Sequence, residues 1–293
     1  MPGHLQFATP SALEYFSTLV ADDASLSLVE AAVAVAQLDY PRLDCQAVLA
    51  EIDALADKLK RRIPADAAPR QKLRWLNLYF FEELGFGGNV NNYYDPANSF
   101  VHRVIETRRG IPITLAVLYI EFAAQIGLAA RGVSFPGHFL VKMRMRTGQQ
   151  TGEVVIDPFT GRSLSPDQLD ERLAPYKRSR GLQDDFDVPL ELFLQAAPPR
   201  DILARLLRNL KEIYRNGSDW RRLLAVTDRL VILLPQMDEE RRDRALVLAE
   251  LGDFSAAADD LARYLAARSD ADDHAALSET LRQWRSAGRP PLH

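Results

Sequence analysis

Arg109-Gly110-Ile111-Pro112-Ile113-Thr114 opens a long apolar segment, and the rest of the predicted fold is arranged around it. Proline fits the first turn of a helix, where its missing N–H would have no partner in any case. Almost every residue from Ile113 to Ile126 is apolar, and the exceptions Thr114, Glu121 and Gln125 fall on one narrow stripe. Because a helix that is apolar on most sides is buried on most sides, this stretch predicts a buried central helix.

The residues that follow change from a helical period to the period of a strand. Apolar and polar residues alternate toward the end of Gly132–Arg146, which is typical of a half-exposed strand. Thr147–Gly152 contains two glycines and predicts a hairpin loop, with Val154–Ile156 as the return strand. An antiparallel hairpin of this kind would place Asp157 beside residues 138–142.

The residues before the central helix predict further helices and one ordered loop. Residues 11–63 look helical, and apolar residues recur at helical spacing over Asp44–Arg62. Another helix is expected over Gln71–Leu84, because glycines follow it and glycine commonly ends a helix. Asn89–Asn98 combines turn-forming residues with aromatic residues, which indicates an ordered loop. A short helix capped by its serine is expected over Ser99–Glu106.

The C-terminal part of the chain is helical and repetitive. Pro198-Pro199 marks its start, and the pair Asp219-Trp220 recurs in similar form as Asp253-Phe254. The period between the two pairs, about 34 residues, together with an aromatic residue at the turn is typical of tetratricopeptide (TPR) repeats. Two repeats need a neighbour to bury their free face, and Ala271–Trp284 is expected to form a final capping helix. An ordinary helical bundle with coincidental spacing is the alternative.

The composition limits the classes of function. The chain of 293 residues has a net charge of −4, which gives no reason to expect nucleic acid as a partner. No run of 18 apolar residues predicts a membrane span, and the first residues do not read as a signal peptide, so we expect a cytoplasmic protein. The single cysteine, Cys45, excludes a disulfide framework and a multi-cysteine metal site. Cys45 is either a small buried residue or a nucleophile at a helix start.

The side chains that could carry chemistry are Glu106, Thr114, His138 and Asp157. A histidine on a strand, with an aspartate on the neighbouring strand, is the arrangement that orients a base for nucleophilic catalysis. Such a pair needs a nucleophile at the start of a helix, where the helix dipole favours a thiolate. Gly110–Thr114 stands at that place and contains no cysteine.

Five motifs follow one another between residues 75 and 161. They are Leu76-Asn77 with Tyr79-Phe80-Phe81 and Glu83-Leu84-Gly85-Phe86, Asn92-Tyr93-Tyr94-Asp95-Pro96 with Asn98-Ser99-Phe100, Gly110-Ile111-Pro112-Ile113-Thr114-Leu115, Phe135-Pro136-Gly137-His138-Phe139-Leu140, and Ile156-Asp157-Pro158-Phe159. This stretch resembles the transglutaminase-like core, and in particular the bacterial SirB-type family of uncharacterised regulator proteins. In that family the core is followed by TPR-like helices. The resemblance extends more loosely over residues 11–63 and 200–270.

The resemblance implies a catalytic triad that is incomplete in this chain. Transglutaminase-like enzymes use a cysteine on the central helix, a histidine on one strand and an aspartate on the next. His138 and Asp157 match the histidine and the aspartate, whereas the cysteine position falls within Pro112–Thr114. Thr114 carries the only hydroxyl there. It is either a nucleophile or a structural residue that caps the helix or bonds back to its backbone. His138 is either a structural partner of Asp157 or a base or ligand in a surviving site, and the pair alone offers too few ligands for a metal.

The predicted fold is α+β and mainly helical, with a transglutaminase-like (papain-like) core, a small antiparallel sheet and C-terminal TPR-like helix pairs. We expect an N-terminal helical segment over 1–70, the core over 71–197 and the TPR-like helices over 198–293. The expected function is that of a non-enzymatic or regulatory protein with a protein-interaction surface. The alternative is an atypical hydrolase or acyltransferase that uses His138 and Asp157.

The predicted sites and partners follow from these two functions. The catalytic candidates are His138, Asp157 and Thr114. The binding candidates are Asn92, Tyr93, Tyr94, Asp95 and Glu106. The first four belong to a loop that is either a scaffold of turns or one wall of the old active site, whereas Glu106 is expected to pair with a nearby arginine or a helix end. We expect a protein or peptide partner, no nucleic acid, no membrane, no cofactor and no metal, and the oligomeric state stays open.

Overall fold

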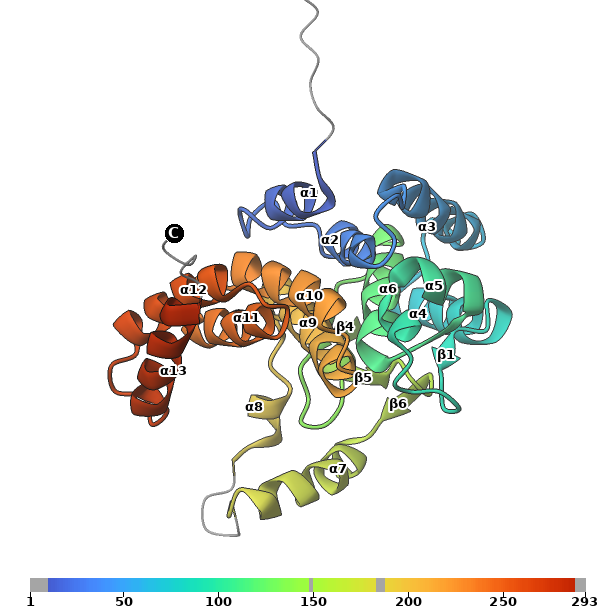
Figure 1. The fold of residues 1–293 in the computed structure, drawn as a ribbon. Helices are drawn as coiled ribbons and strands as arrows, with labels where there is room; N and C mark the ends of the chain where they lie inside the picture. Colours follow the sequence, from blue (N-terminus) through green and yellow to red (C-terminus); the bar gives the residue numbers. More distant parts are fainter. Residues whose placement is uncertain (1–9, 148–149, 183–187, 288–293) are drawn as a thin grey trace, which may run out of the picture. The chain divides into compact units, whose positions relative to one another are not determined.

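The computed structural model describes residues 10–147, 150–182 and 188–287. Over these residues the protein is mainly helical, with one four-stranded antiparallel sheet (Figure 1). The predicted fold class, α+β and mainly helical with a small antiparallel sheet, is therefore confirmed.

The chain forms two compact units, each built from separate segments. The first unit contains Met1–Leu26, Gln37–Pro41 and Leu207–His293, and the second contains Ser27–Ala36 and Arg42–Leu206. Two helices carry the chain from one unit to the other, namely the short 3₁₀ helix η1 (Ala36–Leu38) and the long helix α9 (Pro199–Asn216). The predicted domain boundaries after residues 70 and 197 stay a prediction.

Helix α6 (Pro112–Gln125) is the centre of the second unit. Ten of its 14 residues are buried, which confirms the predicted central helix and its start at proline. The helices α2 (Leu28–Val35), α3 (Cys45–Lys60), α4 (Pro69–Asn77) and α5 (Val101–Thr107) all pack against it. Since neighbours surround it, almost any polar side chain on α6 would lose its water.

The predicted helix over Gln71–Leu84 is regular only in its first part. Helix α4 passes at Leu78 into a π-helix, η2 (Leu78–Glu83), and Gly85 follows in the left-handed conformation. Two consecutive phenylalanines of η2 contact the same ring of α6: the centroids of Phe80 and Phe81 lie 5.3 and 5.5 Å from that of Tyr119. In a regular α-helix consecutive side chains point about 100° apart, which is too far for both to reach one ring. The contacts of both phenylalanines with Tyr119 therefore give a reason for the wider turn of the π-helix.

The sheet has the strand order β3-β4-β5-β6, and every neighbouring pair is antiparallel. Its strands are β3 (Ala130–Val133), β4 (Leu140–Thr147), β5 (Gln150–Asp157) and β6 (Arg162–Leu164). Val141 pairs with Ile156, so Asp157 ends β5 beside the start of β4, as the hairpin predicted. Residues 148–149 of the predicted hairpin loop lie outside the described residues.

The single strand predicted over Gly132–Arg146 is wrong. Two strands cover this segment, and a turn at Pro136-Gly137 separates them, with Gly137 at a φ of 68°. Proline has no N–H for a strand ladder and glycine accepts positive φ, so this dipeptide interrupts the sheet. His138 therefore stands in a turn before β4 and not on a strand.

The loop before α6 is held by a two-stranded parallel ribbon, β1 (Gly87–Gly88) with β2 (Arg109–Gly110). The 3₁₀ helix η3 (Pro96–Ser99) leads into α5, whose N-cap is Phe100. The prediction that Ser99 caps this helix is wrong. Ser99 is fully buried, and its Oγ has no hydrogen-bond partner among the described residues.

The last part of the second unit covers one face of the sheet. Helix α7 (Pro166–Ser179) starts with a capping box at Ser165, and α8 (Leu190–Phe193) follows. The core there joins strand and helix residues, namely Val133, Phe135, Leu140, Val155, Leu169, Leu173 and Leu194. This core fixes the position of β4 and β5, whose ends carry His138 and Asp157.

The first unit contains the predicted repeat. Helices α10 (Trp220–Leu233) and α12 (Phe254–Ala267) occupy equivalent places in the two repeats, and Asp219 and Asp253 cap them through their side chains. Both helices also end in the same backbone conformation, with φ −124° and ψ 62° in one and φ −124° and ψ 60° in the other. The period therefore reflects a repeated backbone rather than coincidental spacing.

The remaining helices of this unit complete the stack. Helix α11 (Asp238–Glu250) packs on both α10 and α12, and α13 (His274–Ala287) packs on α12 as the expected final helix. At the other end, α1 (Ala12–Leu19) packs on α10, and its Phe16 is completely buried. The repeat helices thus receive an N-terminal cover from a segment near the start of the chain.

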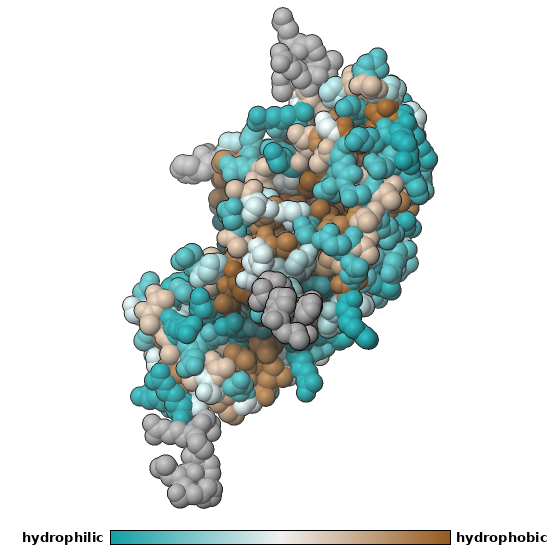
Figure 2. Space-filling view, turned by 90° about the horizontal axis from the view of Figure 1, so that it is seen from above, coloured by the Kyte–Doolittle hydropathy of each residue, from teal (hydrophilic) through white to brown (hydrophobic). Residues whose placement is uncertain are grey.

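No helix among the described residues is long and apolar enough to cross a membrane. Hydrophilic residues cover much of the face in Figure 2, with smaller groups of hydrophobic residues between them.

Candidate functional site

His138 and Asp157 form a hydrogen-bonded pair. The Nε2 atom of His138 lies 2.8 Å from Oδ1 of Asp157. The register of β4 with β5 brings the two residues together, because Val141 pairs with Ile156, and Asp157 follows Ile156 at this end of the ladder. The His138 side chain is 23% exposed and that of Asp157 only 2%, so the pair is open to solvent from the histidine side alone.

Asp157 is held in its ionised form. Its Oδ1 also accepts a hydrogen bond from the backbone N–H of Phe159 at 3.0 Å, and its Oδ2 lies 3.2 Å from Nη1 of Arg172 on α7. Burial raises the pKa of this carboxyl, but the hydrogen bond and charge of His138, the Phe159 N–H and Arg172 together lower it to about 2. A charged carboxylate in this place keeps the imidazole in one orientation.

Arg205 braces the turn that carries His138. Its guanidinium donates to Ser134 Oγ at 2.6 Å, to the Phe135 carbonyl at 3.3 Å and to the His138 carbonyl at 2.8 Å. The same group lies over the ring of Phe139, 5.5 Å from its centroid. Burial lowers the pKa of Arg205, as expected for a partly desolvated cation. One planar group therefore ties the whole turn to the first turns of α9.

Aromatic rings continue the site on the other side of His138. The ring of Phe159 lies 6.5 Å from that of His138 in an edge-on arrangement, and 6.1 Å from that of Tyr93. Tyr93 in turn contacts Tyr94, with 5.4 Å between the centroids. Tyr93 is 43% exposed and Tyr94 78%, so this row of rings runs from the histidine to the surface.

The loop over Asn89–Asn98 holds these tyrosines in place. Asn98 is buried, and its side-chain N–H groups donate to the carbonyls of Asn92 at 2.7 Å and Tyr93 at 3.1 Å. Asn92 and Asp95 bond to each other at 3.1 Å, and Asp95 also caps η3. Of the predicted binding residues, Tyr93 and Tyr94 thus extend toward the site, while Asn92 and Asp95 build the turn.

Glu106 does not belong to this cluster. It is exposed on α5 and forms an ion pair with Arg103, one helical turn earlier. This ion pair confirms the expected pairing of Glu106 with a nearby arginine, on the solvent-facing side of α5.

The side chain of Thr114, the hydroxyl at the predicted nucleophile position, is closed off from solvent. Thr114 has no exposed surface, and its Oγ1 finds no hydrogen-bond partner in the described part of the chain, so a capping or back-bonding role for this hydroxyl is wrong. Cys45 is buried at the start of α3, where burial, with the nearby charges of Asp44 and Glu30, raises its pKa to about 11. Neither side chain offers His138 a reactive group.

The contacts around His138 orient its imidazole as they would orient a general base. The Nε2 atom of His138 is hydrogen-bonded to Asp157, so Nδ1 is the ring atom that can accept a proton from another group. Among the described residues, no group of three or more His, Cys, Asp and Glu side chains could hold a metal ion. Arg172, Arg205 and Phe159 were not expected at this site. A lone charge inside the apolar run Ile202–Leu207 was the one sequence signal for Arg205.

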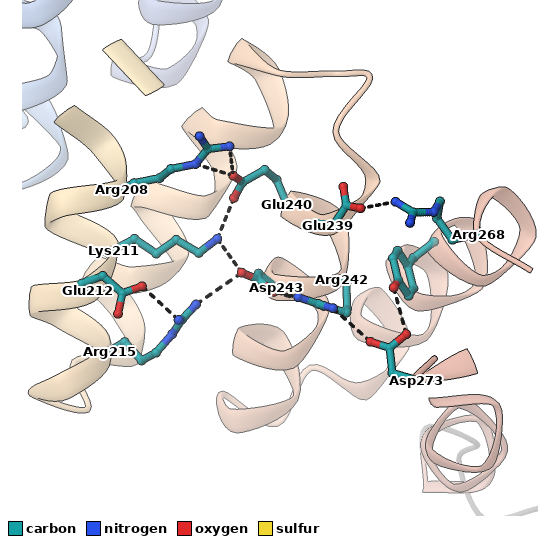
Figure 3. A network of polar contacts seen from close by, with 11 residues as sticks. Arg208, Lys211, Glu212, Arg215, Glu239, Glu240, Arg242, Asp243, Arg268 and Asp273 are labelled. Carbon is teal, nitrogen blue, oxygen red and sulfur yellow. Dashed lines mark hydrogen bonds and ion pairs between the residues drawn. The ribbon is translucent and has the colours of Figure 1, made fainter. Parts of the chain in front are cut away.

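A second polar cluster joins the repeat helices α9 and α11 to Asp273, the residue directly before α13 (Figure 3). Lys211 is 7% exposed and places its Nζ 2.6 Å from Glu240 and 2.5 Å from Asp243. Arg208 donates twice to the other oxygen of Glu240, at 2.9 and 2.8 Å. These pairs join the first helix of one repeat to the first helix of the next.

The same connection recurs one repeat later. Arg242 has the same place in its repeat as Arg208 in the one before, and its Nη1 lies 2.9 Å from Asp273, which precedes α13. Asp273 also accepts a hydrogen bond from Tyr264 at 2.9 Å. Ion pairs therefore connect α9 with α11, and α11 with the residue that precedes α13.

Comparison with known proteins places both parts of the chain. The transglutaminase-like superfamily matches residues 46–208, and the tetratricopeptide repeat matches residues 210–282. The transglutaminase-like core and the TPR helices expected from the sequence are thereby confirmed.

Several relatives cover most of the chain. The UPF0162 protein of Xylella fastidiosa (strain 9a5c) is 39% identical over 250 residues, which is 85% of this chain and 86% of that protein. The UPF0162 protein of Vibrio cholerae is 25% identical over 231 residues, or 78% and 81% of the two chains. The human F-box only protein 21 is 39% identical over 72 residues, which is 25% of this chain and 12% of that protein.

No solved structure is significantly similar to the chain. The extent of the matches, in sequence and in domain order, agrees with the SirB-type resemblance. The chain therefore belongs to the transglutaminase-like superfamily and, within it, to the bacterial UPF0162 family.

Proposed function

We propose that this protein is a non-enzymatic interaction protein, in which a transglutaminase-like core without a nucleophile is joined to TPR helices that bind a protein partner. One observation carries the proposal. Thr114 carries the one hydroxyl in the stretch Pro112–Thr114, near which the resemblance puts the thiol of the related enzymes, and it is completely buried and forms no hydrogen bond with His138 or any other described group. A buried threonine hydroxyl with no base beside it is a poor nucleophile.

The repeat helices support the binding part of the proposal. TPR repeats generally mediate protein–protein interaction, and stacked helix pairs present extended surfaces for this purpose. On α11, Leu246 is 42% exposed although it lies close in sequence to Arg242 and Asp243 of the polar cluster. An exposed leucine on a repeat helix offers apolar surface that a partner can bury.

Photo-crosslinking tests this surface. A photoreactive amino acid at Leu246 is expected to give one saturable crosslinked product in cells, which an excess of unlabelled protein removes. The control places the same amino acid at Arg263, which is exposed on the second helix of the repeat. Equal products from both positions, or none from Leu246, would contradict the proposal.

A hydrolase that activates water is the second candidate, and the geometry of His138 is the reason to keep it. Its Nε2 is fixed by an ionised Asp157, and Nδ1 is not used by this bond. The side chain is partly exposed next to Phe159, which in turn contacts Tyr93. A base in this state removes a proton from water without a protein nucleophile.

Ester and amide substrates separate the two candidates. The interaction protein predicts no turnover above background and full crosslinking for both the wild type and His138→Gln. The hydrolase predicts turnover that His138→Gln abolishes while crosslinking at Leu246 is retained. The cytoplasmic location expected from the sequence stays a prediction.

A further inference from the structure

A cavity of about 440 Å³ opens on the second unit, and none of the residues of the His138 site lines it. Its volume lies in the range of about 300–1,000 Å³ that is typical of ligand pockets. Among the described residues, those that line it belong to the continuous helical stretch α4–η2: Gln71, Arg74, Trp75, Asn77, Leu78 and Glu82. The cavity therefore runs along one helix, across the point where the α-helix becomes a π-helix.

The cavity carries one charge of each sign, and neither is paired. Arg74 and Glu82 are both exposed, and no ion pair or hydrogen bond of their side chains is found among the described residues. The neighbouring Glu83 differs, because it pairs with Arg62. A cavity lined by one positive and one negative side chain is complementary in charge to a ligand that carries both signs.

Between the two charges the cavity is lined by two apolar side chains and one amide side chain. Trp75 is half-buried and Leu78 is 39% exposed, so an indole face and a branched side chain meet the ligand. Asn77 uses its Oδ1 to accept a hydrogen bond from Tyr119 at 2.5 Å. Its Nδ2 consequently remains as a donor for a carbonyl, fixed in direction by the buried tyrosine.

The spacing of the charges defines the length of the ligand. Arg74 and Glu82 are eight residues apart, and a rise of about 1.5 Å per residue separates their backbone positions by about 12 Å. An extended peptide advances about 3.3 Å per residue, so three or four residues span this distance. A single amino acid is too short, and a partner helix is too wide for a cavity of about 440 Å³.

We propose that this cavity binds a short peptide of three or four residues with both termini free. Glu82 pairs with the terminal ammonium group, Arg74 pairs with the terminal carboxylate, and Trp75 and Leu78 cover an apolar side chain in the middle. Asn77 donates to a backbone carbonyl. The site is independent of the partner surface on the repeat helices and of any reaction at His138.

The tripeptide Gly-Leu-Gly is the probe, titrated into the full-length protein. The indole N–H signal of Trp75, identified by its absence in Trp75→Phe, reports binding in nitrogen-15 NMR spectra. We expect a saturable shift at millimolar peptide, and a roughly three- to fivefold weaker affinity when either terminus is blocked by acetylation or amidation. No saturable shift, or the same affinity for the free and the doubly blocked peptide, would overturn the proposal.

Two variants assign each terminus to its charge. In Glu82→Gln, acetylation of the peptide is expected to have no further effect while amidation still weakens binding, and in Arg74→Gln the two blocks exchange roles. Arg70→Gln and Glu51→Gln are the controls, because both residues are exposed and neither lines the cavity. If a control variant changes the response as strongly as its counterpart, the binding is nonspecific charge attraction and the assignment is wrong.

Discussion

The carboxylate of Asp157 accepts hydrogen bonds on both of its oxygens, and this determines how the His138 pair responds to acid. Three groups favour its ionised form: the imidazole of His138, the N–H of Phe159 and the guanidinium of Arg172. Protonation of the carboxyl removes the negative charge that these three groups stabilise and turns one of its two oxygens from an acceptor into a donor. The pair is therefore a structural element at neutral pH, whether or not it also has a chemical role.

The pH dependence of stability follows from this. The pKa of Asp157 is lowered in the folded protein from 3.8 to about 2, so its ionised form stabilises the fold above about pH 4. That contribution, about 2 kcal/mol, is lost as the pH falls from 4 toward 2. In Asp157→Asn the free energy of unfolding, measured with urea, should change less over this interval than in the wild type. Glu106→Gln, at an exposed carboxyl, should keep the wild-type slope.

Thr114 allows a second prediction at this scale. Its buried hydroxyl has no partner among the described residues, and an unsatisfied buried hydroxyl costs about 1–3 kcal/mol. Thr114→Val should therefore raise the free energy of unfolding by about 1 kcal/mol and leave any activity unchanged. Thr227→Val is the matched control, since Thr227 is equally buried but donates to the carbonyls of Leu223 or Leu224. That variant should lose about 1 kcal/mol, and a loss in both variants would disprove the assignment.

At the scale of elements, the short ribbon of β1 and β2 positions the aromatic row beside His138. Gly88 donates its N–H to the Phe159 carbonyl at 2.9 Å, and Asn89 donates to that of Gly110 at 3.1 Å. A Cβ atom at Gly88 would stand 2.2 Å from the Phe159 ring. Only glycine lets the ribbon and this ring approach so closely.

Gly88→Ala should displace the Phe159 ring from His138 and Tyr93. Overpacking of this kind costs about 1–3 kcal/mol, so thermal unfolding should occur at a lower temperature. Gly152→Ala is the control, because a Cβ there would meet no atom within 4 Å. It should change stability by less than about 0.5 kcal/mol. If the two variants unfold alike, Phe159 is not held by this contact.

The elements also show where the sequence was sufficient. The central helix and the repeats could be predicted because their signals are local: Pro112 starts α6, and Asp219 and Asp253 cap equivalent helices. The π-helix could not, since it depends on Phe80 and Phe81 meeting Tyr119, which belongs to a different helix much later in the chain. The single strand through residues 132–146 was wrong for a related reason, because alternation in its second half concealed the turn at Pro136-Gly137.

The residues of the candidate site likewise divide into those that the sequence could predict and those that it could not. His138 and Asp157 could be placed near each other because two consecutive strands form a hairpin, while the register that faces Asp157 toward His138 came only from the structure. Arg172 and Arg205 could not be assigned, since each reaches the site from a helix whose packing no local pattern reveals. Glu106 was included for its sequence position alone, and the helical period turns it to solvent beside Arg103.

At the scale of the whole molecule, the repeat helices depend on a segment from the other end of the chain. Phe16 of α1 is completely buried in the first unit, and the guanidinium of Arg229 lies 5.8 Å from the centroid of its ring. Residues 37–41 contribute as well, because Asp39 accepts a hydrogen bond from Tyr214 at 2.9 Å. The repeats are thus completed by residues that no repeat period could identify.

Phe16→Ala should destabilise the repeat unit although it lies far from the repeats in sequence. Truncation of a buried phenylalanine costs about 3–5 kcal/mol. Amide hydrogen exchange should accelerate in α10, against which α1 packs, more than in α6 of the other unit. Thr18→Ala, at an exposed position of the same helix, should leave exchange unchanged. Equal protection of α10 in both variants would show that the repeats stand without α1.

The burial of Phe16 against α10 has a consequence for the time course of synthesis. The ribosome must add the whole stretch from Phe16 to Trp220 before the first residue of α10 exists. At about 5–20 residues per second this takes roughly 10–40 s. Throughout that interval the nascent α1 segment has no native surface to bury its phenylalanine, so it is exposed to chaperones and proteases while the core matures. The docking of α1 therefore has to wait until the ribosome has made α10, about 200 residues later in the chain.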